Sequence, residues 1–193
     1  MYSFVISFIL LLLINSQSSA QLKSGNTFWK WASWTILQSV PSVTYFEDRN
    51  ENNSSLKFSL EWQLTPFSYS FKSNKYVSPV QFFFIRPSER FSGSLEAFFQ
   101  PEYVTGEFKY AALKKFMFKT GSRIIIPVAH SGEYLSFSLG MGFYYQKMKN
   151  NEVKDGMTYE AALYFLFGMM GAKFNYNVNA PSRYNFGLYF KYY

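Results

Sequence analysis

The chain of 193 residues contains no cysteine and only one histidine. Without cysteine there can be no disulfide framework, no thiol nucleophile, no cysteine metal site and no lipid anchor on a cysteine. Charged residues are also scarce: they make up 16% of the chain, against roughly 25% in an average soluble protein, whereas aromatic residues reach 22%. This is too little charge to cover a soluble surface comfortably. The formal net charge of +7 alone does not separate lipid phosphates from nucleic acid as partners.

The longest apolar run lies near the start of the chain. It extends from Phe4 to Ile14, is interrupted only by Ser7, and is too short to cross a bilayer as a helix. Polar and small residues follow and end at Ala20, a pattern typical of a secretory signal peptide, although residues 1–3 include no Lys or Arg. We therefore expect residues 1–20 to be a signal peptide cleaved after Ala20, and residues 21–193 to form one domain.

The remaining chain has no apolar run long enough for a membrane helix, and its hydrophobic pattern repeats every second residue. In 135–143, for example, Leu, Phe and Met alternate with Ser and Gly, and segments 56–65 and 184–192 alternate in the same way. Turn-rich stretches such as 48–54 and 150–156 separate these segments. The sequence therefore predicts an all-β fold with antiparallel strands.

The composition of the two strand faces indicates which one points inward. One face carries Phe, Leu, Tyr and Trp, and the other carries mostly Ser, Gly, Ala, Gln and Asn with a few charges. A solvent-facing surface would be richer in Lys and Glu, whereas a narrow barrel interior accommodates small residues and ion pairs. This favours a closed up-and-down transmembrane β-barrel over a soluble barrel, whose apolar face lies inside. Closure also pairs every backbone polar group within hydrocarbon.

The charged residues on the small-residue face are the first candidate functional group. A lone charge inside a barrel is costly, so we expect these residues to form a paired network that fills the lumen; in a wider barrel they would line a pore. The predicted lumen charge network is Lys57, Glu61, Glu96, Lys119, Arg123, Glu160 and Lys191.

The second candidate is an alternating aromatic segment at the end of the chain. It comprises Tyr184, Phe186, Leu188, Phe190, Tyr192 and Tyr193. Together with the leader and the amphipathic strands, this segment resembles small bacterial outer-membrane β-barrels of the OmpA transmembrane-domain type. In that group the last strand ends on an aromatic residue that the insertion machinery recognises, so the resemblance implies an insertion signal here. The alternating set ends at Tyr192, which leaves Tyr193 one residue out of phase.

Eight strands are the preferred count, at 34–47, 55–71, 77–86, 91–104, 115–129, 133–147, 157–170 and 183–193. The alternative has ten strands: a turn at 168–171 makes 172–178 a separate strand, and another strand lies between residues 28 and 40. With eight strands and both termini in the periplasm, the longer connections would face the periplasm, whereas such barrels keep periplasmic turns short. Ten strands would remove this conflict.

The single histidine lies in the segment 129–133, AHSGE. Lipid A deacylases, which are also membrane barrels, carry His-x-Ser on one strand, so that both side chains share a face. Here His130 and Ser131 are adjacent and would point to opposite faces of a strand, and the segment is typical of a turn. We therefore expect a turn and no catalytic residue.

A cluster of Glu47, Asp48 and Glu51 with nearby asparagines offers oxygen ligands for calcium. Its spacing matches no ordered calcium loop, and a polar hairpin tip is the favoured interpretation. We expect no metal site and no cofactor.

These observations predict a non-enzymatic outer-membrane barrel that acts as a structural element or as the membrane subunit of a larger assembly. A narrow passive pore for small solutes is the alternative, and a lipid A-modifying enzyme is a third, less favoured one. The expected partners are outer-membrane lipid and other outer-membrane proteins, and not nucleic acid. The basic stretches at 109–119 and 147–154 are interpreted as solvated loops, with lipid phosphates or an acidic partner as the alternative.

Overall fold

In the computed structural model of the protein, residues 32, 39–50, 52–72, 75–77, 92–166 and 168–190 are described. The chain divides into two compact units, 1–32 and 33–193, and every described strand belongs to the second unit. The predicted signal peptide, residues 1–20, lies outside the described residues.

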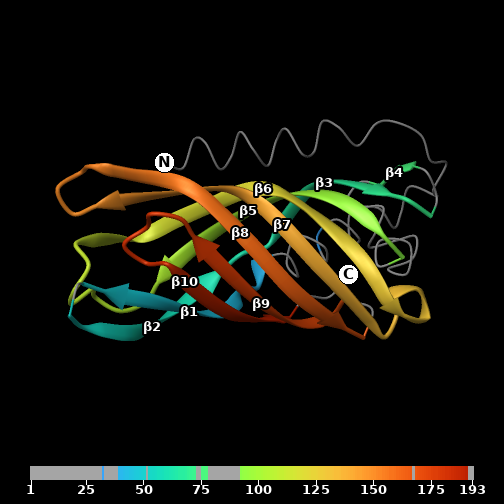
Figure 1. The fold of residues 1–193 in the computed structure, drawn as a ribbon, viewed down its shortest axis with the longest axis horizontal. Helices are drawn as coiled ribbons and strands as arrows, with labels where there is room; N and C mark the ends of the chain where they lie inside the picture. The colour runs from blue at the N-terminus through green and yellow to red at the C-terminus, as the bar shows by residue number, and fades with distance from the viewer. Residues whose placement is uncertain are drawn as a thin grey trace. The chain divides into compact units, whose positions relative to one another are not determined.

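Ten strands form one sheet in which all neighbours are antiparallel (Figure 1). The strands are β1 (Ser42–Arg49), β2 (Ser54–Glu61), β3 (Leu64–Ser70), β4 (Lys75–Val77), β5 (Ser94–Val104), β6 (Leu113–Ala129), β7 (Leu135–Met148), β8 (Val153–Phe165), β9 (Met170–Asn177) and β10 (Tyr184–Phe190). A short 3₁₀ turn, His130–Gly132, connects β6 to β7.

The sheet closes on itself through β2 and β5. Residues 59–61 of β2 pair with 102–104 of β5, and β3 continues along the same strand of the barrel by pairing with 94–99. β2 and β3 are therefore two halves of one barrel strand, interrupted at Trp62 and Gln63. Within the described residues, β4 pairs with β3 alone and lies outside the closed ring of strands. Because β4 lies outside the ring, and β2 and β3 count as one strand, the ten strands form a closed eight-stranded barrel. This confirms the predicted closed antiparallel β-barrel and the preferred strand count.

One of the eight predicted strands is wrong, and a second, 77–86, lies almost entirely outside the described residues. The predicted strand 157–170 is interrupted, because β8 ends at Phe165 and β9 begins at Met170. The turn between them places Leu166 at φ 49° and Gly168 at φ 73°. The predicted strand 77–86 is not needed to close the barrel: Val77 ends β4, and residues 78–86 lie outside the described part of the chain. The eighth position belongs to β9, close to the strand at 172–178 that the ten-stranded alternative contained.

Because neighbouring strands are antiparallel, the connections alternate between two ends of the barrel. Rim A, on the left in Figure 1, carries the connections 50–53, 105–112, 149–152 and 178–183. Rim B carries the connections 130–134 and 166–169, and β3 leads away from the barrel there. β1 begins and β10 ends at rim B.

The distribution of side chains between the two faces is the reverse of that in a soluble protein. Along β7, Leu139, Met141 and Phe143 are 49–63% exposed on the outer wall, whereas the alternating Ser136 and Ser138 are completely buried. The same phase holds in β10, where Phe186 is exposed and Asn185 is buried. The outer wall is thus apolar, and most of the small and polar side chains of the strands point inward, as the composition of the two faces predicts.

Candidate functional site

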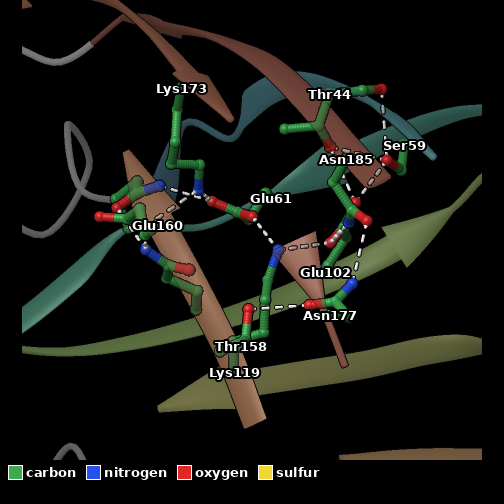
Figure 2. A network of polar contacts seen from close by, with 12 residues as sticks. Thr44, Ser59, Glu61, Glu102, Lys119, Thr158, Glu160, Lys173, Asn177 and Asn185 are labelled. Atoms are coloured by element: carbon green, nitrogen blue, oxygen red, sulfur yellow. Dashed lines mark hydrogen bonds and ion pairs between the residues drawn. The ribbon is translucent and has the colours of Figure 1, made fainter. Parts of the chain in front are cut away.

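The centre of the lumen is a network of buried charges from five strands (Figure 2). Lys119 of β6 lies between two carboxylates: its Nζ is 2.7 Å from Oε2 of Glu61 and 3.0 Å from Oε2 of Glu102. Lys173 of β9 forms an ion pair with the other oxygen of Glu61. Glu61 therefore joins two lysines that are 54 positions apart in the sequence.

Arg123, four residues after Lys119 on the same face of β6, forms the second part of the network. Its Nε is 3.0 Å from Glu96, and its NH1 is 3.0 Å from Glu160. The ring of Phe98 lies beside the guanidinium, whose central carbon is 5.7 Å from the ring centroid. The second oxygen of Glu160 accepts a hydrogen bond from Gln100 and lies 3.8 Å from the Nζ of Lys173. All these charges have at least one partner of opposite charge, as burial in a low-dielectric interior requires.

Glu102 connects the charges to neutral side chains of β1, β2 and β10. Its Oε1 accepts hydrogen bonds from Thr44 at 2.9 Å and from Ser59 at 2.6 Å, and its Oε2 accepts one from Asn185 at 2.9 Å. Asn177 continues this chain by donating to the side-chain oxygen of Asn185 and accepting from Thr158. Figure 2 shows these groups converging from separate strands. The network consequently ties together strands that are not neighbours in the sheet.

The small residues of β7 make room for this network. Gly140 pairs with Arg123 on one side and with Glu160 on the other. A Cβ atom at this position would lie 3.0 Å from the Cβ of Arg123 and 3.3 Å from that of Glu160. Because Gly140 has no side chain, the guanidinium and the carboxylate meet across β7. The small Ser and Gly residues on the inward face of β7 thus leave the space that the charged side chains occupy.

Apolar side chains close the lumen toward rim A. Phe46, Val104, Phe108, Leu113 and Met117 are buried together there. Phe108 comes from the connection 105–112, and this connection is held by Asp48. The carboxylate of Asp48 accepts backbone hydrogen bonds from Lys109 at 2.8 Å, Tyr110 at 3.2 Å and Ala111 at 2.8 Å.

A second apolar cluster lies on the rim B side of the charges. Ile125, Ala162, Tyr164 and Tyr189 are buried, and the rings of Tyr164 and Tyr189 are in edge contact with their centroids 5.4 Å apart. The lumen is therefore filled at three levels: an apolar cluster, the charge network and a second apolar cluster. All three levels can be followed along the inward face of β6, as Leu113 and Met117, then Lys119 and Arg123, then Ile125.

The structure brings five of the seven predicted lumen charges together at the centre. These are Glu61, Glu96, Lys119, Arg123 and Glu160. Lys57 lies nearer rim A and pairs with Asp48 at 3.8 Å. Lys191 lies outside the described residues.

Two central members of the network, Glu102 and Lys173, are absent from the predicted set. Glu102 has the same inward phase as Glu96 and Gln100, so the alternation itself could have identified it, although Pro101 interrupts the pattern. Lys173 was missed because the predicted strand 157–170 ends before it, so that no inward face was assigned to this residue in the eight-stranded prediction. Asp48 was assigned to a polar hairpin tip. This is wrong, because Asp48 is completely buried within β1, and only Asn50 and its neighbours form the turn.

The terminal strand presents the aromatic and aliphatic residues of the predicted insertion signal on the outer wall. Tyr184, Phe186 and Leu188 are 43–49% exposed, Phe190 ends β10, and Tyr192 and Tyr193 lie outside the described residues. His130 lies in the turn between β6 and β7 with φ 49°, which confirms the predicted turn. Its ring contacts Tyr134.

The part of the chain that the structure describes contains no group of three or more acidic or histidine side chains placed to hold a metal ion. Among the same residues, no helix combines the length and the apolar character needed to cross a bilayer.

Fold and interior together define a class of protein: a closed antiparallel barrel of eight strands with an apolar outer wall and a lumen filled by a charge network. No protein-family model, no curated protein and no solved structure matches this chain.

Proposed function

We propose that the protein is a non-enzymatic outer-membrane β-barrel, which serves as a structural element or as the membrane subunit of a larger outer-membrane assembly. The observation that supports this is the reversed distribution of side chains. Large apolar residues such as Leu56 and Phe143 are 72% and 63% exposed on the outer wall, while Arg123 and Lys119 are buried inside. In water, an apolar surface around the whole wall would drive aggregation, whereas lipid tails would cover it.

Five of the eight barrel strands are long enough to cross a bilayer, which supports this proposal. A strand that crosses the hydrocarbon layer needs about 9–11 residues. β5, β6, β7 and β8 have 11, 17, 14 and 13 residues, and β2 with β3 extends from residue 54 to residue 70. β1, β9 and β10 are shorter, with 8, 8 and 7 residues.

The filled lumen favours a structural or subunit role over the passive-pore alternative. A solute would have to pass the cluster around Phe108, the ion pairs of Lys119 and Arg123, and the rings of Tyr164 and Tyr189. Eight-stranded barrels generally have interiors that side chains fill. In the proposed role, the protein therefore contacts lipids and other proteins through its outer wall and its rims.

The first experiment is cell fractionation followed by SDS electrophoresis with and without boiling. A closed membrane barrel has no free strand edge and resists SDS when cold, so we expect the protein in the outer-membrane fraction, with an unboiled band that migrates differently from the boiled one. Recovery from the soluble fraction without detergent would contradict the proposal. In planar bilayers we expect the purified protein not to conduct, and stepwise conductance would favour the pore instead.

A further inference from the structure

Several lysines gather at rim A on the side of β6 and β7. Lys109, Lys114, Lys147 and Lys149 are exposed there. Leu113 pairs with Met148, so Lys114 and Lys147 each lie one residue from this pair on neighbouring strands, where the register then shifts before Met117. Two hydrogen bonds hold the cluster together: the backbone N–H of Lys149 donates to the carbonyl of Ala112 at 2.8 Å, and Nζ of Lys114 donates to Asn151 at 2.6 Å.

Acidic side chains of this rim pair with other lysines, and Glu107 also interacts electrostatically with Lys149, but the cluster as a whole stays positive. Lys115 is 2.7 Å from Glu107, and its hydrogen bond lowers the pKa of that carboxyl. Lys154 is 2.9 Å from Glu152 and lowers the pKa of Glu152 in the same way. Within the described residues, Lys109, Lys114 and Lys147 form no ion pair. Like charges held side by side on neighbouring strands repel each other, so an external anion would stabilise them.

The cluster begins where the apolar outer wall ends. On the outward face of β6, Lys114 comes two residues before Phe116, which is 52% exposed. On β7, Phe143, Tyr145 and Lys147 follow one another at a spacing of two, so they share the outward face. If lipid tails cover the outer wall, these ammonium groups lie at the depth of the phosphate groups.

We infer that Lys114, Lys147 and Lys149 bind the phosphate groups of lipid headgroups in the leaflet at rim A. This inference depends on the proposed membrane location. Two features favour lipid over an acidic protein: Lys114 and Lys147 project sideways from the wall rather than from a loop tip, and they continue directly from the apolar surface. The site therefore binds lipids with a net negative headgroup, in which no positive group of the same headgroup neutralises the phosphate.

The test uses the full chain purified as a folded barrel in a neutral detergent, and counts bound lipids by native mass spectrometry. The probes are phosphatidylglycerol, whose headgroup is anionic, and phosphatidylcholine, whose phosphate is compensated. We expect the wild type to prefer phosphatidylglycerol, and the K114Q/K147Q variant to lose at least about fivefold of that preference. K115Q/K154Q is the matched control, because it removes two positive charges from the same rim that are already paired with Glu107 and Glu152. We expect the control to retain the preference.

Three results would overturn the inference. These are equal binding of the two lipids by the wild type, equal losses in both variants, and lysine-dependent binding of a soluble polyglutamate peptide without any lipid preference. The last result would assign the cluster to an acidic protein partner. The heat-dependent shift in SDS is measured on every sample, since its loss would show that the barrel itself is absent. A barrel that shifts and enters vesicles but shows no lipid preference refutes only the lipid site and leaves the proposed function standing.

Discussion

Arg123 is buried in the lumen and lies between two carboxylates, those of Glu96 and Glu160. Removing it leaves two carboxylates without their shared cation. We therefore expect Arg123→Met to lower the free energy of unfolding by about 3–5 kcal/mol, the range for breaking a buried ion pair by deleting one partner. Urea titration of the barrel in lipid vesicles, followed by the heat-shifted band, measures this loss.

A compensated variant distinguishes unpaired charge from lost packing. In Arg123→Met combined with Glu96→Gln and Glu160→Gln, no charge remains unpaired at this point, so most of the lost stability should return. If the triple variant is as unstable as the single one, the packing of the long arginine side chain between β5 and β8 is the main contribution, and the ion pairs are secondary.

The charged residues also show what the alternating pattern can and cannot predict about a single residue. Glu61, Lys119 and Arg123 could be placed inside because each interrupts a clear apolar alternation with a charge in the small-residue phase. Their individual partners could not be predicted, since pairing depends on which strands face each other across the lumen. Lys119 and Glu61 are 58 positions apart in sequence, and no local pattern relates them.

At the scale of the element, errors occurred where the chain turns without the usual turn residues. The apolar sequence at 159–170 predicts a continuous strand, yet Leu166 adopts a positive φ, which side chains other than glycine rarely do. Gly168 was the one residue here that indicated a turn, and the ten-stranded alternative placed its turn at 168–171 for this reason. Conversely, β2 and β3 were correctly predicted as one strand, 55–71, because the interruption at Trp62 and Gln63 preserves the inward phase of Glu61, Gln63 and Thr65.

The contact between β6 and β7 depends on a pair of facing glycines. Gly121 and Gly142 are directly opposite each other, and a Cβ atom at Gly142 would lie 2.1 Å from the carbonyl oxygen of Thr120. Backbone cannot move aside as a side chain can. We expect Gly142→Ala to destabilise the barrel by about 1–3 kcal/mol, measured by the same urea titration.

Gly106 offers the matched control for this substitution. A Cβ atom there would meet only the side chain of Lys57, at 3.8 Å, which is ordinary van der Waals contact. Gly106→Ala should therefore change the stability by no more than about 0.5 kcal/mol. Similar effects of the two substitutions would mean that β6 and β7 separate enough to accept a methyl group.

At the scale of the whole molecule, the sequence predicted a closed barrel, its strand number and the orientation of its faces, because all three depend on period and composition. It did not predict how the lumen is closed. The two apolar clusters combine residues from distant elements, such as Phe46 with Phe108 and Ile125 with Tyr189. The closure at rim A also requires that Phe108 of the connection 105–112 point into the lumen, although the next two residues, Lys109 and Tyr110, stay exposed.

Asp48 links this closure to the barrel wall, since it joins β1 to a connection more than 60 residues later in the sequence. Hydrogen bonds to a charged acceptor are worth roughly 1.5–3 kcal/mol each. Asp48→Asn removes the charge and one of the two acceptor oxygens, so the connection 105–112 should open more often. We expect trypsin to cleave after the exposed Lys109 at least about tenfold faster in this variant, as measured by fragment mass, while the heat-shifted band remains.

Glu107→Gln is the appropriate comparison, because Glu107 lies in the same connection but forms its ion pair with Lys115 at the exposed surface. Exposed pairs contribute little, so its cleavage rate should stay within about twofold of the wild type. If Asp48→Asn is cleaved no faster than Glu107→Gln, the packing of Phe108 against Phe46, with ring centroids 5.6 Å apart, holds the connection in place, and the carboxylate only satisfies backbone groups that packing has already buried. A faster cleavage confined to Asp48→Asn would instead make this carboxylate the group that keeps rim A closed.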